Sequence, residues 1–101
     1  MKLMTPQLEK AFENYPLYSQ DGKGENATVV VKFFNPIGAG TWLITEGEKQ
    51  PNGDWLFFGF CHITEWEWGY VTLSDFESVN LPYGFKIERD LHFQGTVKEG
   101  V

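Results

Sequence analysis

The residues of this sequence best suited to chemistry form a run of alternating carboxylates and indoles, Glu65, Trp66, Glu67 and Trp68. Carboxylates pair with cations, and indole rings attract cations over their faces, so such a run can hold a cationic or sugar-like ligand. Trp is also a favoured anchor of protein interfaces. On a strand, however, the two indoles would lie on one side and pack, while the carboxylates are solvated. A partner-binding role, a small-ligand site and a purely structural role all stay open.

Catalytic and metal-binding roles have less support. Glu65 and Glu67 could form the carboxylate pair that glycoside hydrolysis requires, but a short chain with short loops has little room for a sugar-sized cleft. The only imidazoles are His62 and His92, and no His-x-x-x-His or Cys-x-x-Cys spacing accompanies them. Cys61 directly precedes His62, so on a strand the two side chains point to opposite sides and form no nucleophile pair. We therefore expect no catalytic residues, no metal site and no cofactor.

The charge of the chain favours some classes of partner over others. The chain has a formal net charge of −6, which disfavours nucleic acid because binding to its backbone needs Lys and Arg to displace counterions. Residues 50–85 contain no Lys or Arg. Arg89, the only arginine, lies between Glu88 and Asp90. This alternation predicts a cross-strand ion pair or a solvated edge, and the functional alternative is an anion anchor at Arg89. We expect a protein partner and no direct nucleic-acid binding.

The cellular location is predicted from what the sequence contains. Cys61 is the only cysteine, so the chain forms no internal disulfide, which is typical of a reducing compartment. Its apolar runs are shorter than a signal peptide or a membrane span requires. We expect a cytoplasmic protein with no membrane partner, and the sequence leaves the oligomeric state open.

The elements that must position these residues follow from hydrophobic periodicity and turn residues. Thr5 and Pro6 predict the start of a helix over residues 6–14. Ser74 and Glu77 form a capping box that predicts a short helix near 75–79. Four β-rich segments predict strands over residues 27–34, 41–45, 55–63 and 68–73, and residues 85–93 predict a last strand or an extended arm.

The third predicted strand is apolar on both faces. Trp55 and Phe57 point one way and Leu56 and Phe58 the other, which indicates a strand inside the sheet. Short connections favour an antiparallel arrangement. We therefore predict an α+β fold, a four- to five-stranded, mostly antiparallel β-meander. The N-terminal helix would cover one face, and the short helix with the C-terminal arm would cover the other. Residues 1–93 would form a single domain and 94–101 a flexible tail.

Five segments in order carry a family resemblance: VKFFNP at 31–36, TW at 41–42, LFFG at 56–59, GYVTLSDFESV at 69–79 and IERDLHF at 87–93. In this order they resemble the bacterial family called domain of unknown function 2958. The resemblance implies a bacterial protein, often encoded near plasmid or other mobile-element genes. It implies no agreed activity and no catalytic residues.

These observations favour a non-enzymatic accessory or interaction module of bacterial mobile elements. It would bind a protein partner through the acidic, Trp-bearing end of the sheet. Trp66 and Trp68 would be the anchors, and Glu65 and Glu67 the charged rim. Two alternatives stay open. One is a small-ligand-binding protein or minor hydrolase with a pocket between sheet and helix, and the other is an acidic mimic of nucleic acid.

Overall fold

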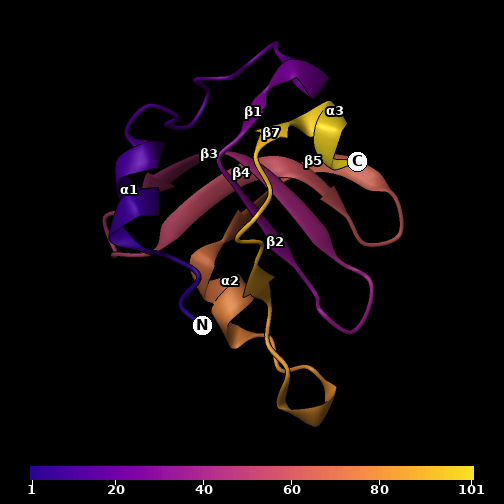
Figure 1. Ribbon diagram of the computed structural model, residues 1–101. Coiled ribbons are helices and arrows are strands. Elements are labelled where there is room, and N and C mark those ends of the chain that lie inside the picture. The colour runs from indigo at the N-terminus through magenta and orange to yellow at the C-terminus, as the bar shows by residue number, and fades with distance from the viewer.

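A five-stranded antiparallel sheet forms the centre of the computed structural model, which describes all 101 residues (Figure 1). The strands lie in the order β5 (Trp66–Thr72), β4 (Trp55–His62), β3 (Thr41–Lys49), β2 (Val31–Phe34) and β6 (Glu88–Arg89). β2 to β5 follow one another as a meander, and β6 pairs with the free edge of β2. The α+β fold class and the antiparallel meander predicted from the sequence are confirmed.

Both longer helices cover the same face of this sheet. Phe12 of α1 (Pro6–Phe12) and Phe76 of α2 (Leu73–Ser78) belong to one buried cluster with Phe33 and Phe57. The ring centroids of Phe33 and Phe76 are 4.8 Å apart, and those of Phe12 and Phe57 are 5.5 Å apart. The prediction that the short helix covers the opposite face was wrong, because α2 begins directly at the end of β5 and turns its single buried side chain, Phe76, under the sheet.

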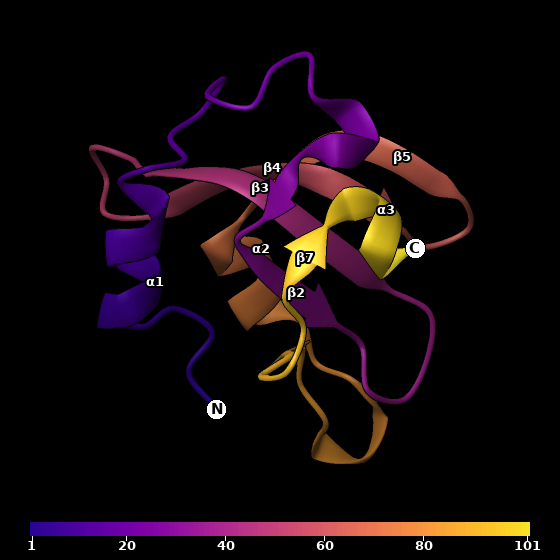
Figure 2. The same ribbon diagram turned by 45° about the horizontal axis from the view of Figure 1, so that its top comes forward.

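The opposite face is covered by a two-stranded ribbon and the short helix that follows it. β1 (Thr28–Val29) pairs antiparallel with β7 (Gly95–Thr96), and α3 (Val97–Gly100) follows at once (Figure 2). Ala27, Val29, Leu43 and Val97 form a second buried cluster there. Residues 94–101, expected from the sequence to form a flexible tail, include β7 and α3 of this layer. That segment is held by Val97, whose side chain is 1% exposed, and by a capping box between Thr96 and Glu99.

Several element bounds differ from those predicted. The expected strand 27–34 is divided at Val30, since β1 pairs with β7 and β2 pairs with β3. β3 continues through a bulge between Ile44 and Glu46, so the hairpin turn is confined to residues 50–54. Of the last strand or extended arm predicted over 85–93, only β6 pairs.

The start of α2 also differs. Its N-cap is Thr72, whose hydroxyl accepts the N–H of Asp75 at 3.1 Å, while Asp75 accepts the N–H of Thr72 at 3.3 Å. The same reciprocal geometry was predicted two residues later, at Ser74 and Glu77. Ser74 instead donates its hydroxyl to Asp54 at 2.6 Å, which ties α2 to the start of β4.

Two short 3-10 turns complete the chain, η1 (Gly24–Asn26) and η2 (Pro82–Gly84). None of the helices combines the length and the apolar character needed to cross a lipid bilayer.

Candidate functional site

Five aromatic side chains share the face of β4 and β5 that points away from α1 and α2. The register pairs Phe58 with Tyr70 and Phe60 with Trp68, and Trp66 pairs with His62 one step further. Side chains alternate along a strand, so these positions lie on one side. We call Phe58, Phe60, Trp66, Trp68 and Tyr70 the aromatic face.

The rings of the aromatic face support one another. Phe58 and Trp68 stack with centroids 5.5 Å apart and planes 11° apart, and Phe60 and Trp66 stack at 5.1 Å. Each such pair contributes about 0.5–1.5 kcal/mol beyond the area that it buries. The layer around α3 packs against Phe60 and Trp66. It leaves Trp68 40% and Tyr70 53% exposed on β5, an edge strand.

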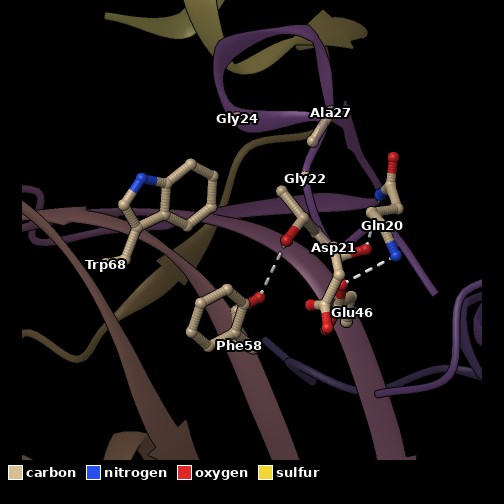
Figure 3. Close-up of a pocket in the computed structure, with 9 residues that line it drawn as sticks. Gln20, Asp21, Gly22, Gly24, Ala27, Glu46, Phe58 and Trp68 are labelled. Atoms are coloured by element: carbon tan, nitrogen blue, oxygen red, sulfur yellow. Dashed lines mark hydrogen bonds between the residues drawn. The ribbon is translucent and has the colours of Figure 1, made fainter. Parts of the chain in front are cut away.

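A pocket of about 300 Å³ opens between the aromatic face and the loop 20–27. Figure 3 shows Trp68 and Phe58 on one side of it and Asp21 and Glu46 on the other. We call this cavity the Trp68 pocket. It combines two aromatic side chains with two carboxylates, a composition suited to a cation.

Glu46 is a buried acid at the β3 bulge, and only 2% of its surface is exposed. Its carboxylate accepts the backbone N–H of Tyr18 at 2.7 Å and that of Gln20 at 2.8 Å. No basic side chain pairs with it, since the only ion pair in the structure joins Lys32 and Asp90 at 3.7 Å. The negative charge of Glu46 is thus stabilised by backbone dipoles alone, beside the pocket.

Gln20 holds the loop onto the sheet from the other side. Its amide nitrogen donates to the carbonyls of Thr28 and Thr45, both at 2.7 Å, and its side-chain oxygen accepts the N–H of Thr28 at 2.7 Å. β1 and β3 are not paired with each other, and the Gln20 side chain joins them through these hydrogen bonds. Because these polar atoms are all satisfied, the wall of the pocket is a built structure.

The Tyr70 hydroxyl reports the electrostatics of this region. Its pKa is raised above the ordinary value, chiefly through hydrogen bonding with the Tyr18 side chain, then through desolvation, through Tyr18 when that hydroxyl is itself ionised, and through the negative charges of Glu46 and Asp21. Both carboxylates of the Trp68 pocket therefore act on Tyr70.

The structure separates the four predicted binding residues. Trp66 and Trp68 lie together on the aromatic face, but Glu67 points to the opposite face, where it is paired with Cys61 in the register. Burial, with a smaller contribution from the charge of Glu67, raises the pKa of the Cys61 thiol to about 12. Glu65 lies exposed in the bend between β4 and β5. The two Glu residues thus do not frame the two indoles as one rim.

Arg89, the candidate anion anchor, makes a structural contact. Its Nη1 donates to the backbone carbonyl of Lys2 at 3.0 Å and to that of Leu3 at 3.4 Å, which fastens the N-terminal segment to β6. His62 packs against Trp66 with ring centroids 5.1 Å apart, and His92 is exposed. No group of three or more His, Cys, Asp or Glu side chains is placed to hold a metal ion.

Sequence reasoning missed Phe58, Tyr70, Asp21 and Glu46 as site residues. The aromatic face had a visible signal, since aromatics at every second position of two strands joined by a short turn must share one side. Glu46 had none, because the bulge that buries it depends on tertiary packing.

A second cavity of about 350 Å³ lies between α2 and the edge of the sheet. Its lining is mainly apolar and includes Trp42, Cys61, Val71, Phe76 and Val79, with two acidic residues, Glu67 and Asp75. Gly69 contributes no side chain there, and a Cβ at Gly69 would meet no atom within 4 Å. The cavity is suited to a small apolar group.

Comparison with known proteins gives one match. The model of the family described as "Protein of unknown function (DUF2958)" matches residues 3–99. No curated protein and no solved structure matches the chain. The matched region runs from the N-terminal segment through β7 into α3, so it contains the aromatic face and the Trp68 pocket. Because the match covers nearly all of the 101 residues, the chain belongs to the DUF2958 family.

Proposed function

We propose that this protein is a non-enzymatic interaction module that binds a protein partner through its aromatic face. The observation that carries the proposal is the exposure of Trp68 and Tyr70 on an edge strand, where Trp68 stacks on Phe58 and Tyr70 packs against it at a tilt. Large aromatic side chains that are rigid before binding lose little conformational entropy when a partner covers them. Trp and Tyr are also the residues that most often dominate interface energies.

The surroundings of the face support a protein partner over nucleic acid. Asp21 and Glu46 line the adjoining pocket, and β4 and β5 carry no Lys or Arg. Phosphates would be repelled there, whereas a basic protein surface would be attracted. The proposal places the protein in the bacterial cytoplasm, as an accessory protein of mobile elements. The absence of any disulfide partner for Cys61 is consistent with that compartment.

The test begins with the full chain isolated gently from its host and examined by native mass spectrometry. A protein that co-isolates at fixed stoichiometry is then purified and its affinity for the chain measured. We expect Trp68→Ala to weaken this complex by tenfold or more, because hot-spot truncations cost about 2 kcal/mol or more. Circular dichroism checks that the variant is folded.

Tyr83→Ala is the matched control. Tyr83 is 95% exposed on η2, in the orange loop that projects at the bottom of Figure 1, away from the aromatic face. It should bind the partner like the wild type. The proposal is abandoned if no stoichiometric partner is found, or if folded Trp68→Ala binds the partner as tightly as the wild type.

The cavity beside α2 favours a second candidate, binding of a small apolar ligand. The Cys61 thiol in its lining stays protonated because its pKa is about 12, so the charged groups of the lining are Glu67 and Asp75 and the rest is mainly apolar. Indole is a suitable probe, and NMR titration should shift the amides of Gly69, Val71 and Phe76. Gly69→Leu, whose side chain has room to fill the cavity, should abolish those shifts. Equal shifts in the variant would eliminate this candidate.

A further inference from the structure

We infer that the Trp68 pocket receives the guanidinium group of an arginine side chain from the protein partner. The inference rests on the proposed function, because it names the chemistry of the residue that the partner inserts beside the aromatic face. Three features of the pocket carry it: its charge, its ring surface and its open wall.

The charge of the pocket is negative and has no cation within the chain. Glu46 is buried with two N–H donors and no basic partner. Asp21 is exposed, and its carboxylate accepts no hydrogen bond from the rest of the protein, so its two oxygens are free. A charged group of low exposure interacts more strongly than one in water, because solvent screens it less. A cation in the pocket would therefore meet one fixed and one adaptable carboxylate.

The ring surface favours a planar cation. Phe58 and Trp68 both line the pocket, Trp68 is 40% exposed, and Figure 3 shows Trp68 across the pocket from Asp21. A guanidinium stacks flat on an indole and is weakly hydrated, whereas an ammonium keeps its water and acts as a point charge. The same guanidinium presents paired N–H donors that match a carboxylate such as that of Asp21. Arginine therefore fits both sides of the pocket at once.

The wall of the pocket keeps the entrance open. Gly22 and Gly24 have positive φ angles of 81° and 51°, a region that favours glycine. Neither would have any atom within 4 Å of an added Cβ. No side chain therefore narrows the pocket at these two positions, and the cavity of about 300 Å³ is large enough for a guanidinium and the end of its methylene stem.

The experiment uses the isolated full chain and a defined probe, Nα-acetyl-arginine amide, followed by ¹H–¹⁵N NMR titration. We expect saturable shifts at the Trp68 indole N–H and at the amides of Gly22 and Gly24. Nα-acetyl-citrulline amide, which is nearly the same shape but neutral, should bind at least fivefold more weakly. Raising the ionic strength should weaken the binding of the arginine probe but not that of the citrulline probe.

Asp21→Asn removes the free carboxylate with almost no change in shape, and should weaken the arginine probe about fivefold to tenfold. Glu25→Gln is the matched control, because Glu25 is an exposed acid of the same loop that does not line the pocket. It should bind like the wild type. Equal binding of the citrulline probe, unchanged binding to Asp21→Asn, or tighter binding of Nα-acetyl-lysine amide or tetramethylammonium would each overturn the inference.

This test separates the inference from the proposed function. Arginine binding by the isolated chain, with no protein partner found in the host, would remove the proposed function alone. A partner that requires Trp68 but binds Asp21→Asn as tightly as the wild type would remove the arginine inference alone.

Discussion

The carboxylate of Glu46 accepts the backbone N–H of Gln20 at 2.8 Å, and this contact fixes the distance between the loop and the sheet. Gln20 in turn donates from its side chain to the carbonyl of Thr45, the residue before Glu46. The two residues thus hold each other through main chain and side chain together. The wall of the Trp68 pocket depends on this pair, since Asp21 and Gly22 follow Gln20 directly.

Replacing Glu46 with Gln should destabilise the fold. The variant keeps one acceptor oxygen but turns an amide N–H₂ toward a backbone donor, so one buried N–H loses its partner. We expect the free energy of unfolding, measured in urea, to fall by about 1–3 kcal/mol. Glu48→Gln, at an exposed position of the same strand, should leave it unchanged. An equally stable Glu46→Gln would show that the contact with Gln20 does not hold the loop.

Gly59 and Gly69 face each other in the β4–β5 register but should differ sharply in tolerance to Ala. A Cβ at Gly59 would collide with the backbone carbonyl of Leu43, whereas a Cβ at Gly69 meets nothing. We expect Gly59→Ala to lower the free energy of unfolding by about 3 kcal/mol or more, because backbone cannot move aside cheaply. Gly69→Ala should change it by less than about 0.5 kcal/mol. Similar thermal melting of the two variants would contradict the close approach of β3 and β4.

Val97 should behave as a core residue although it lies in the last turn of structure. Val97→Ala leaves a cavity beside Ala27, Val29 and Leu43, and we expect a loss of about 2 kcal/mol in chemical denaturation. Val101→Ala, at an exposed position, serves as its control. Equal free energies of unfolding for the two variants would instead support the flexible tail predicted from the sequence.

Asp90 should make stability depend on acid pH. The N–H of His92 lowers the pKa of Asp90 below its ordinary 3.8, with smaller contributions from the N–H of Phe93 and the charge of Lys32. A carboxyl whose pKa is lower in the folded state stabilises the fold above the unfolded value, and this contribution is lost as pH falls through the folded value. The difference in unfolding free energy between the wild type and Asp90→Asn should therefore shrink from pH 5 toward pH 2.5. A constant difference over that range would refute the role of the charged form.

Cys61 should be unreactive in the folded protein. Only the thiolate reacts with a disulfide reagent, and a pKa near 12 in place of 9.0 leaves roughly a thousandfold less thiolate at pH 8. We expect slow labelling in buffer and rapid labelling in urea. Glu67→Gln should speed the reaction in buffer modestly, because it removes the smaller of the two causes. Labelling that is equally fast in both solvents would show that the thiol is not shielded.

Much of the fold was accessible from sequence because its signals are local. Alternation from Trp55 to His62 correctly divided β4 into two faces, and Thr5 with Pro6 correctly began α1. The errors arise where distant contacts decide. Nothing within residues 27–34 shows that the strand is divided at Val30. The regular structure near residue 96 depends on β1, a partner strand far away in the sequence.

The candidate site also combines features with a local sequence signal and features that depend on distant contacts. Trp66 and Trp68 were singled out from composition, and strand alternation explains why Glu67 leaves their side of the sheet. Asp21 lies in a polar loop that looked like a simple connection. Its place beside Trp68 is created by Glu46 and Gln20, whose burial has no pattern in the sequence.

The pairing of β1 with β7 has a consequence for how the protein is made. Thr28 pairs with Thr96, so β1, the first strand of the chain, can form its ladder only after β7, the last strand, has been made. During synthesis the meander of β2 to β5 can pair as it leaves the ribosome, because its neighbours are close in sequence. The second layer, with Ala27, Val29 and Leu43, stays open to water until residue 97 has emerged. The nascent chain therefore exposes this apolar surface until residue 97 has left the ribosome, and that interval is when it most needs a chaperone.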